Sequence, residues 1–184
     1  MSPTLAKCRV CLTGLVRRFG RSGSGATAVE FGLIAAPFLA TLLAIFQTCI
    51  FLFAQATLQN AAVQAGRLFL TGQAQSSGTT QSQFQTQICP MVQALFTCSN
   101  VMVNVQAYSD FSSANASAPT LTFNSQGQVS NSWSYTAGSP GQVMVVQLIY
   151  LWPIVGGPFG YILPNVHAGK TEIMGVTAFR VEPY

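Results

Sequence analysis

The longest apolar stretch of the chain lies near its N-terminus. From Phe31 to Ala54 there is no charged side chain, and the strongly polar ones are Thr41, Gln47 and Thr48. A helix over this stretch would be about 36 Å long, whereas the hydrocarbon core of a bilayer is about 30 Å thick. We therefore predict a single membrane-spanning helix over residues 31–54.

The helical pattern begins before this span and continues beyond it. After the span, apolar residues recur at spacings of three and four, which is typical of one face of a helix: Leu58, Ala61, Ala62, Ala65, Leu68 and Phe69. The sequence predicts one helix from Ala26 to about Leu70, ended by Thr71-Gly72. Its first half would face lipid and its second half would pack on a domain. Pro37 interrupts the first half and predicts a kink there.

Downstream of the helix, short strand patterns alternate with polar connections. Strands are expected at 101–108, 121–124, 143–152 and 173–181, polar loops at 110–119 and 125–142, and an irregular excursion at 153–168. Before the first strand we predict a polar linker over 73–83 and a short helix, which either covers 84–96 or begins near Pro90. The predicted fold class is α+β, with the outer half of the long helix lying on a small antiparallel sheet of three or four strands.

Charge gives the expected orientation of the helix. The basic residues before Gly25 are Lys7, Arg9, Arg17, Arg18 and Arg21, and no acidic residue precedes Gly25. Because positive residues flank spans on the cytoplasmic side, we expect a cytoplasmic N-terminus and an outer region after about residue 56. This rule explains the basic segment better than a nucleic-acid site would, so no nucleic-acid partner is expected. The chain then divides into a basic cytoplasmic leader (1–25), the long helix (26–71) and an outer α+β domain (72–184).

Two cysteines fall in the outer domain. Cys89 and Cys98 are alone there, and an oxidising compartment favours a disulfide between them. Such a bridge would close a short loop and contribute about 3 kcal/mol in the chain-entropy model. Cys8 and Cys11 lie on the reducing side, where a single C-x-x-C pair is weak evidence for metal or redox chemistry.

Candidate catalytic groups are scarce. The one histidine, His167, has no second histidine or acid at metal-ligand spacing. Asp110 is the only acid between Glu30 and Glu172, which leaves little for a paired-carboxylate site. The sequence also lacks nucleophile-elbow, phosphate-loop and zinc-protease motifs. We therefore expect no enzyme, no metal and no cofactor.

Glu30 is the exception, because a carboxylate beside the membrane is costly and usually has a partner. In one interpretation it lies at the cytoplasmic rim, solvated by headgroups. In the other, cleavage after Gly25 makes Ala26 the new N-terminus, one helical turn from Glu30. In a packed array of such helices, Glu30 of one subunit could then neutralise the terminal ammonium of a neighbour.

The segment Gly25-Ala-Thr-Ala-Val-Glu30-Phe31, preceded by basic residues and followed by a span, resembles a type IV prepilin signal. Its form is similar to that of the TadE-like minor pseudopilins of Flp (tight adherence, Tad) pili. The long helix, the cysteine pair and the Glu182-Pro183 ending agree with this resemblance. The resemblance implies a pilin-like fold and prepilin peptidase cleavage between Gly25 and Ala26. It also implies that Glu30 is the assembly carboxylate and Phe31 the adjoining aromatic.

The same resemblance implies a function, partners and a compartment. The chain would act in pilus assembly, and through it in adhesion, surface attachment and biofilm formation. Its partners would be a prepilin peptidase, other pilins and pseudopilins, the assembly platform of the bacterial inner membrane, and membrane lipid. The outer domain would lie in the periplasm, with the subunit in the membrane or associated with the pilus. A length of 184 residues favours a minor subunit over the very short major Flp pilins.

Two alternatives stay open. The chain could be an uncleaved, signal-anchored protein whose outer domain binds an envelope partner. It could also be a soluble domain released at the A-x-A sequence Ala54-Gln-Ala56, although the apolar region before it is longer than in a usual signal peptide.

Overall fold

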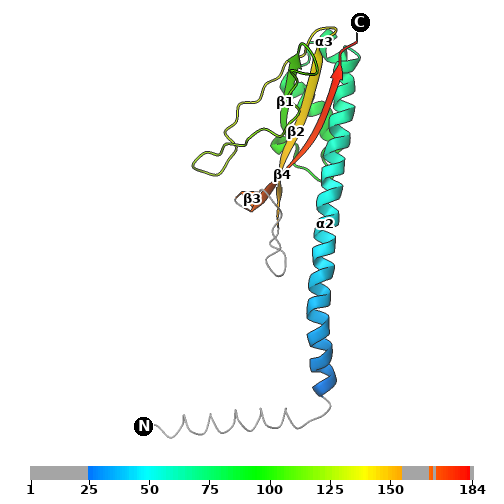
Figure 1. Cartoon of the computed structure of the whole chain (residues 1–184), viewed down its shortest axis with the longest axis vertical. Coiled ribbons are helices and arrows are strands. Elements are labelled where there is room, and N and C mark those ends of the chain that lie inside the picture. The colour runs from blue at the N-terminus through cyan, green and yellow to red at the C-terminus, as the bar shows by residue number, and fades with distance from the viewer. Residues whose placement is uncertain (1–24, 155–165, 168, 183–184) are drawn as a thin grey trace.

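The computed structural model describes residues 25–154, 166–167 and 169–182. The main feature of the molecule is one long helix, α2 (Ala26–Leu70), with a small α+β unit packed along its C-terminal half (Figure 1). The N-terminal half of α2 projects beyond that unit on its own (Figure 1). Both predicted ends of the helix are confirmed, and so is the α+β fold class.

Four strands form one antiparallel sheet in the spatial order β1-β2-β4-β3. They are β1 (Met102–Tyr108), β2 (Val143–Pro153), β3 (Val166–His167) and β4 (Lys170–Arg180). β2 is central, as predicted, and pairs along its whole length with β4. Every residue of β2 from Val143 to Tyr150 is buried, because both faces of the sheet are covered there.

The strand expected at 121–124 is wrong. Only an isolated bridge joins Phe123 to Val129. The side chain of Asn124 accepts hydrogen bonds from the backbone N–H groups of Gln126 and Gln128, which closes a tight turn at this point. The local turn chemistry of asparagine therefore outweighs the short apolar alternation.

The C-terminal strand is longer at its start than predicted, since β4 begins at Lys170 rather than at residue 173. It ends one residue earlier than expected, at Arg180. The expected excursion at 153–168 contains the last residue of β2 and the whole of β3. Residues 155–165 and 168 of that excursion lie outside the described part of the chain.

The segment expected to be a linker, 73–83, is mostly helical. It contains α3 (Gln73–Ser76) and the start of α4 (Gln81–Val92). Thr80 begins α4 through a capping box: its hydroxyl accepts from the N–H of Gln83, and the Gln83 side chain accepts from the N–H of Thr80. This helix-start signal lies in polar sequence, where apolar periodicity gives no indication of a helix.

Helix α4 differs from both alternatives considered for the short helix. It begins before residue 84, continues through Pro90 in its last turn, and ends at Val92. Phe84, Ile88 and Val92 are buried at four-residue spacing and join the core that α2 and the sheet share. Helix α4 thus forms part of the core, although its ends differ from the predicted ones.

The predicted disulfide between Cys89 and Cys98 is present, with the two Cα atoms 5.5 Å apart. It joins α4 to η2 (Cys98–Asn100), the short 3-10 turn that leads into β1. Gln85 of α4 also donates hydrogen bonds of 2.9 Å to the carbonyl oxygens of Cys98 and Val101. The start of β1 is thus held against α4 by both a covalent bond and hydrogen bonds.

Helix α2 approaches β4 closely enough to require glycine on each element. A Cβ atom on Gly175 of β4 would overlap the carbonyl oxygen of Leu58. A Cβ atom on Gly66 of α2 would lie 2.8 Å from side-chain atoms of Thr177 and Phe179. The two glycines therefore set how near the helix lies to the sheet.

Candidate functional site along helix α2

The residues predicted to act in processing and assembly lie together at the free end of α2, far from the sheet (Figure 1). Gly25 is the N-cap of the helix, and no side chain caps it. Ala26 and Glu30 are exposed, and 73% of the Phe31 surface is accessible. No ion pair joins Glu30 to another residue that the structure describes. With respect to the described residues, this carboxylate is therefore available to a further partner.

The N-terminal half of α2 exposes large apolar side chains on all sides. They include Val29, Phe31, Leu33, Ile34, Phe38, Leu39, Leu43, Ile45, Phe46, Ile50, Leu52 and Phe53. A soluble monomer rarely exposes a contiguous apolar surface of this kind. Among the described residues, α2 is the one helix that is long and apolar enough to cross a membrane. Its apolar half must be surrounded by lipid or by other apolar helices.

The polar side chains within this half are accommodated by the helix itself. Thr41 donates a hydrogen bond of 2.8 Å to the carbonyl oxygen of Pro37, and Thr48 donates one of 2.9 Å to that of Ala44. A hydroxyl that bonds back to the preceding turn has no unsatisfied donor in hydrocarbon. These threonines are thus compatible with a membrane span. α2 continues without a break past Pro37, and the kink expected there stays a prediction.

The C-terminal half of α2 is bound to the sheet by glutamine side chains. The Gln59 amide donates to the carbonyl oxygen of Val176 over 2.7 Å and accepts from the N–H of the same residue over 2.9 Å. One helical turn earlier, Gln55 donates to the carbonyl oxygen of Met174 over 2.8 Å. β3 pairs with the first two residues of β4 on the edge that β2 does not use, and from Met174 to Val176 this edge is covered by glutamine side chains instead of a strand.

The opposite edge of the sheet is covered in a similar way. Gln81 of α4 donates to the carbonyl oxygen of Val103, and Gln85 donates to that of Val101. Farther along β1, Val105 exchanges backbone hydrogen bonds with Ser134 and Thr136 of the long loop. Neither long edge of the sheet is thus open to unrestricted pairing with another strand.

The sequence prediction did not find these glutamines or the glycines of the helix–sheet contact. The sequence around Gln59 gives no indication that it binds a strand, because its partner Val176 is 117 positions away. The one available signal was the four-residue spacing of Gln55 and Gln59, which places both on the same side of a helix.

Metal and catalytic groups do not gather in the part of the chain that the structure describes. No three of its His, Cys, Asp and Glu side chains lie close enough together to hold a metal ion. The side chain of His167 lies outside that part. The expectations of no metal, no cofactor and no enzymatic activity stay predictions.

Residues 25–67 match the model of one protein family, described as TadE-like protein. This segment of the chain is TadE-like. The match confirms the resemblance of this segment to TadE-like proteins that was inferred from the sequence. No curated protein and no solved structure matches the chain.

The TadE-like segment coincides with nearly the whole of α2. It begins at the helix N-cap, Gly25, and ends in the last helical turn, at Arg67. It includes the exposed apolar half as well as Gln55 and Gln59, which bind the sheet. The strands and the disulfide lie outside the matched segment.

Proposed function

We propose that the chain is a minor pseudopilin of a Tad (Flp) pilus system, in which it serves pilus assembly as a structural subunit. The observation that carries this proposal is the position of the TadE-like segment: it lies on a helix with one exposed apolar half and one half packed on a domain. A helix of this design can be held in a membrane and later packed against the helices of other subunits without unfolding its domain.

The packing of α2 defines the part that lipid can surround. Phe51 is the first hydrophobic residue of α2 that packs against the core of the α+β unit, and Ala54 is buried within it. The free part from Ala26 to Ile50 would be about 37 Å long, which still exceeds the hydrocarbon thickness of about 30 Å. The span thus ends a few residues earlier than the predicted 31–54. With the basic leader in the cytoplasm, the α+β unit lies in the periplasm.

Processing by a prepilin peptidase between Gly25 and Ala26 would place a new ammonium group at the start of α2. Glu30 follows it by one turn and is exposed. In an apolar bundle, a carboxylate and an ammonium group from neighbouring subunits would neutralise each other where neither is solvated by water. Phe31 would then pack against a neighbouring helix. The expected partners are the peptidase, other pilins and pseudopilins, and the inner-membrane assembly platform.

The two alternative functions receive less support. An uncleaved, signal-anchored binding protein does not require a carboxylate at residue 30. Release after Ala56 would cut α2 between Ala54, which is fully buried, and Leu58, which is also buried. It would also remove Gln55, which bonds to the backbone of β4. The released domain would lose part of its own core.

Substitution of Glu30 tests the assembly role. In a pilus-producing cell, we expect Glu30→Ala to enter the membrane at the normal level but to be lost from sheared pili or from the detergent-extracted assembly complex. Glu182→Ala is the matched control, because Glu182 is exposed at the opposite end of the molecule. Normal incorporation of both variants would rule out an electrostatic role for Glu30. Absence of the parent chain itself from both pili and the assembly complex would favour the signal-anchored alternative.

A further inference from the structure

The start of β4 is the end of the sheet nearest the free half of α2, and two hydrogen-bonded pairs give its height along the helix. β4 runs in the same direction as α2, since Gln55 bonds to Met174 and Gln59 bonds to Val176. Lys170 precedes Met174 by four residues, or about 13 Å along a strand. The same distance along a helix is about nine residues. Lys170 therefore lies level with about residue 46 of α2, beside its exposed apolar half.

This height matches the outer surface of a bilayer that α2 would cross. If the hydrocarbon core begins next to Glu30, about 20 residues of helix cross it. Its outer boundary then falls near residue 50. The level of Lys170 is about 6 Å on the hydrocarbon side of that boundary. A lysine side chain can span this distance by extending toward the headgroups.

The chemistry of this end of the unit suits the headgroup layer. Trp152 lies next to Lys170's strand neighbour Thr171 and packs on Phe96, with ring centroids 5.8 Å apart. Phe96 in turn packs edge-on against Tyr150 at 4.9 Å. Phe96 and Tyr150 are themselves buried in the core, so Trp152 is the member of this group that can meet a membrane–water interface, where tryptophan is enriched. Trp152 is only partly buried, so part of its ring is accessible.

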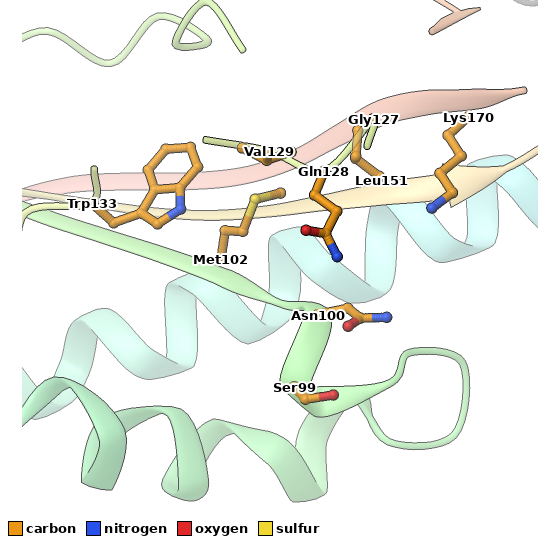
Figure 2. A pocket seen from close by; sticks show the side chains of 9 residues that line it. All are labelled: Ser99, Asn100, Met102, Gly127, Gln128, Val129, Trp133, Leu151 and Lys170. Carbon is orange, nitrogen blue, oxygen red and sulfur yellow. The ribbon is translucent and has the colours of Figure 1, made fainter. Parts of the chain in front are cut away.

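A polar hollow of about 350 Å³ opens beside Lys170 (Figure 2). Figure 2 shows the side chains of Lys170, Asn100 and Gln128 at the same end of this hollow, with Ser99 nearby. An ammonium, two amides and a hydroxyl are hydrogen-bond donors of the kind that bind phosphate oxygens. We call Asn100, Trp152 and Lys170 together the membrane-proximal rim.

Glu172 is the acidic group nearest to the rim along the chain. It lies two residues from Lys170, on the same face of β4. Its Oε1 atom is buried and has no hydrogen-bond partner among the described residues. Burial raises the pKa of Glu172, which reduces the negative charge that would offset Lys170.

We propose that the membrane-proximal rim binds the phospholipid headgroups of the outer leaflet of the membrane that α2 crosses, with Lys170 and Asn100 on the phosphate and Trp152 at the level of the glycerol groups. The proposal rests on the membrane span of the proposed function. It assigns the α+β unit a fixed contact with the membrane surface before assembly, from which the unit must be released when the subunit is extracted.

Depth-dependent fluorescence quenching tests this contact. The full-length protein is placed in nanodiscs whose phosphatidylcholine carries bromine near the carboxyl end of the acyl chains. The chain has two tryptophans, so Trp133→Phe leaves Trp152 as the emitter and Trp152→Phe leaves Trp133.

Trp133 lines the far end of the hollow near Met102 (Figure 2), about 13 Å farther from the membrane along the strands. We expect bromine to reduce Trp152 emission about twofold, as for an interfacial tryptophan, and Trp133 emission much less. Equal, weak quenching of both would overturn the proposal.

A third variant separates a failed contact from a failed span. Phe38→Trp, in a chain with both native tryptophans changed to phenylalanine, reports whether α2 enters the bilayer. Quenching at residue 38 without quenching of Trp152 would overturn the rim contact and leave the span intact. Absence of quenching at both positions would overturn the rim contact together with the span.

The role of Lys170 is tested by lipid charge. Phosphatidylglycerol should increase the quenching of Trp152. In these nanodiscs, Lys170→Gln should lower about fivefold the ratio of protein whose membrane-proximal rim is bound to lipid to protein whose rim is not. Arg67→Gln is the matched control, since Arg67 is exposed at the far end of α2. Excess inorganic phosphate should not change the quenching. Equal effects of the two substitutions, or displacement by inorganic phosphate, would contradict lipid binding through Lys170.

Discussion

The side-chain amide of Gln59 makes two hydrogen bonds to the backbone of Val176, one to its carbonyl oxygen and one from its N–H. This pair joins the TadE-like helix to a strand outside the TadE-like segment. With Gln55 one turn earlier, it replaces the backbone pairing that a further strand would otherwise provide along this part of β4. Helix α2 is therefore attached to the sheet by specific polar bonds as well as by apolar packing.

Removing the Gln59 amide should destabilise the α+β unit. Gln59→Leu keeps the size of the side chain but leaves the N–H and carbonyl groups of Val176 without their partner. Each partly buried polar group left unsatisfied costs about 1–3 kcal/mol. The variant should unfold at lower temperature by circular dichroism in detergent, whereas Gln64→Leu on the exposed side of α2 should not. Identical unfolding temperatures for the two variants would show that the bonds contribute nothing.

The close approach of α2 and β4 predicts which of two alanine substitutions destabilises the protein more. Gly175→Ala would press its Cβ atom against the backbone oxygen of Leu58, which cannot move without shifting the helix. Gly66→Ala would meet the side chains of Thr177 and Phe179, which can rotate away. We expect Gly66→Ala to cost about 1–3 kcal/mol, as for an overpacked core, and Gly175→Ala to cost more. Chemical denaturation of both variants measures this order, and the reverse order would contradict the described helix–sheet contact.

Glu172 predicts a pH dependence of stability. Burial raises the folded-state pKa of this carboxyl above its ordinary value of 4.5. Below pH 4.5 the carboxyl is protonated in both the folded and the unfolded state, so its burial does not lower the stability of the fold through its charge. As pH rises through the raised folded-state pKa, the unfolded state ionises more readily, and folding stability falls.

Glu172→Gln should remove this loss and make the protein at least as stable as the parent at pH 7. Melting curves from pH 4 to pH 8 measure the effect, with Glu182→Gln as the exposed control. If the unfolding temperature changes equally with pH in the parent and in Glu172→Gln, Glu172 does not cause the pH dependence.

The features that were predicted from the sequence have local causes. The helix from Ala26 to Leu70 follows from apolar periodicity, and β2 follows from a run of β-branched and aromatic residues. The disulfide follows from the expected compartment and from Cys89 and Cys98 being the two cysteines of the outer domain. The start of α4 is also encoded locally, in the Thr80–Gln83 capping box, although the polar sequence around it predicts a linker.

The features that were not predicted depend on contacts between distant segments. Gly175 is required only because the Leu58 carbonyl lies against it, and Gln59 matters only because the edge of β4 passes beside it. The height of Lys170 relative to the membrane likewise depends on the pairing of helix and strand. Glu30 is the opposite case: its motif is visible in the sequence, whereas the partner that we propose for it belongs to another molecule.

The central claim is that the chain is processed as a pseudopilin, and the most direct measurement is the N-terminal residue and intact mass of the membrane-extracted protein. The comparison is between cells with and without the cognate prepilin peptidase. We expect a peptidase-dependent start at Ala26, with the chain beginning at Met1 when the peptidase is absent. An intact leader in both samples would contradict processing and leave a signal-anchored protein, whereas a start at Thr57 in both would indicate a released domain.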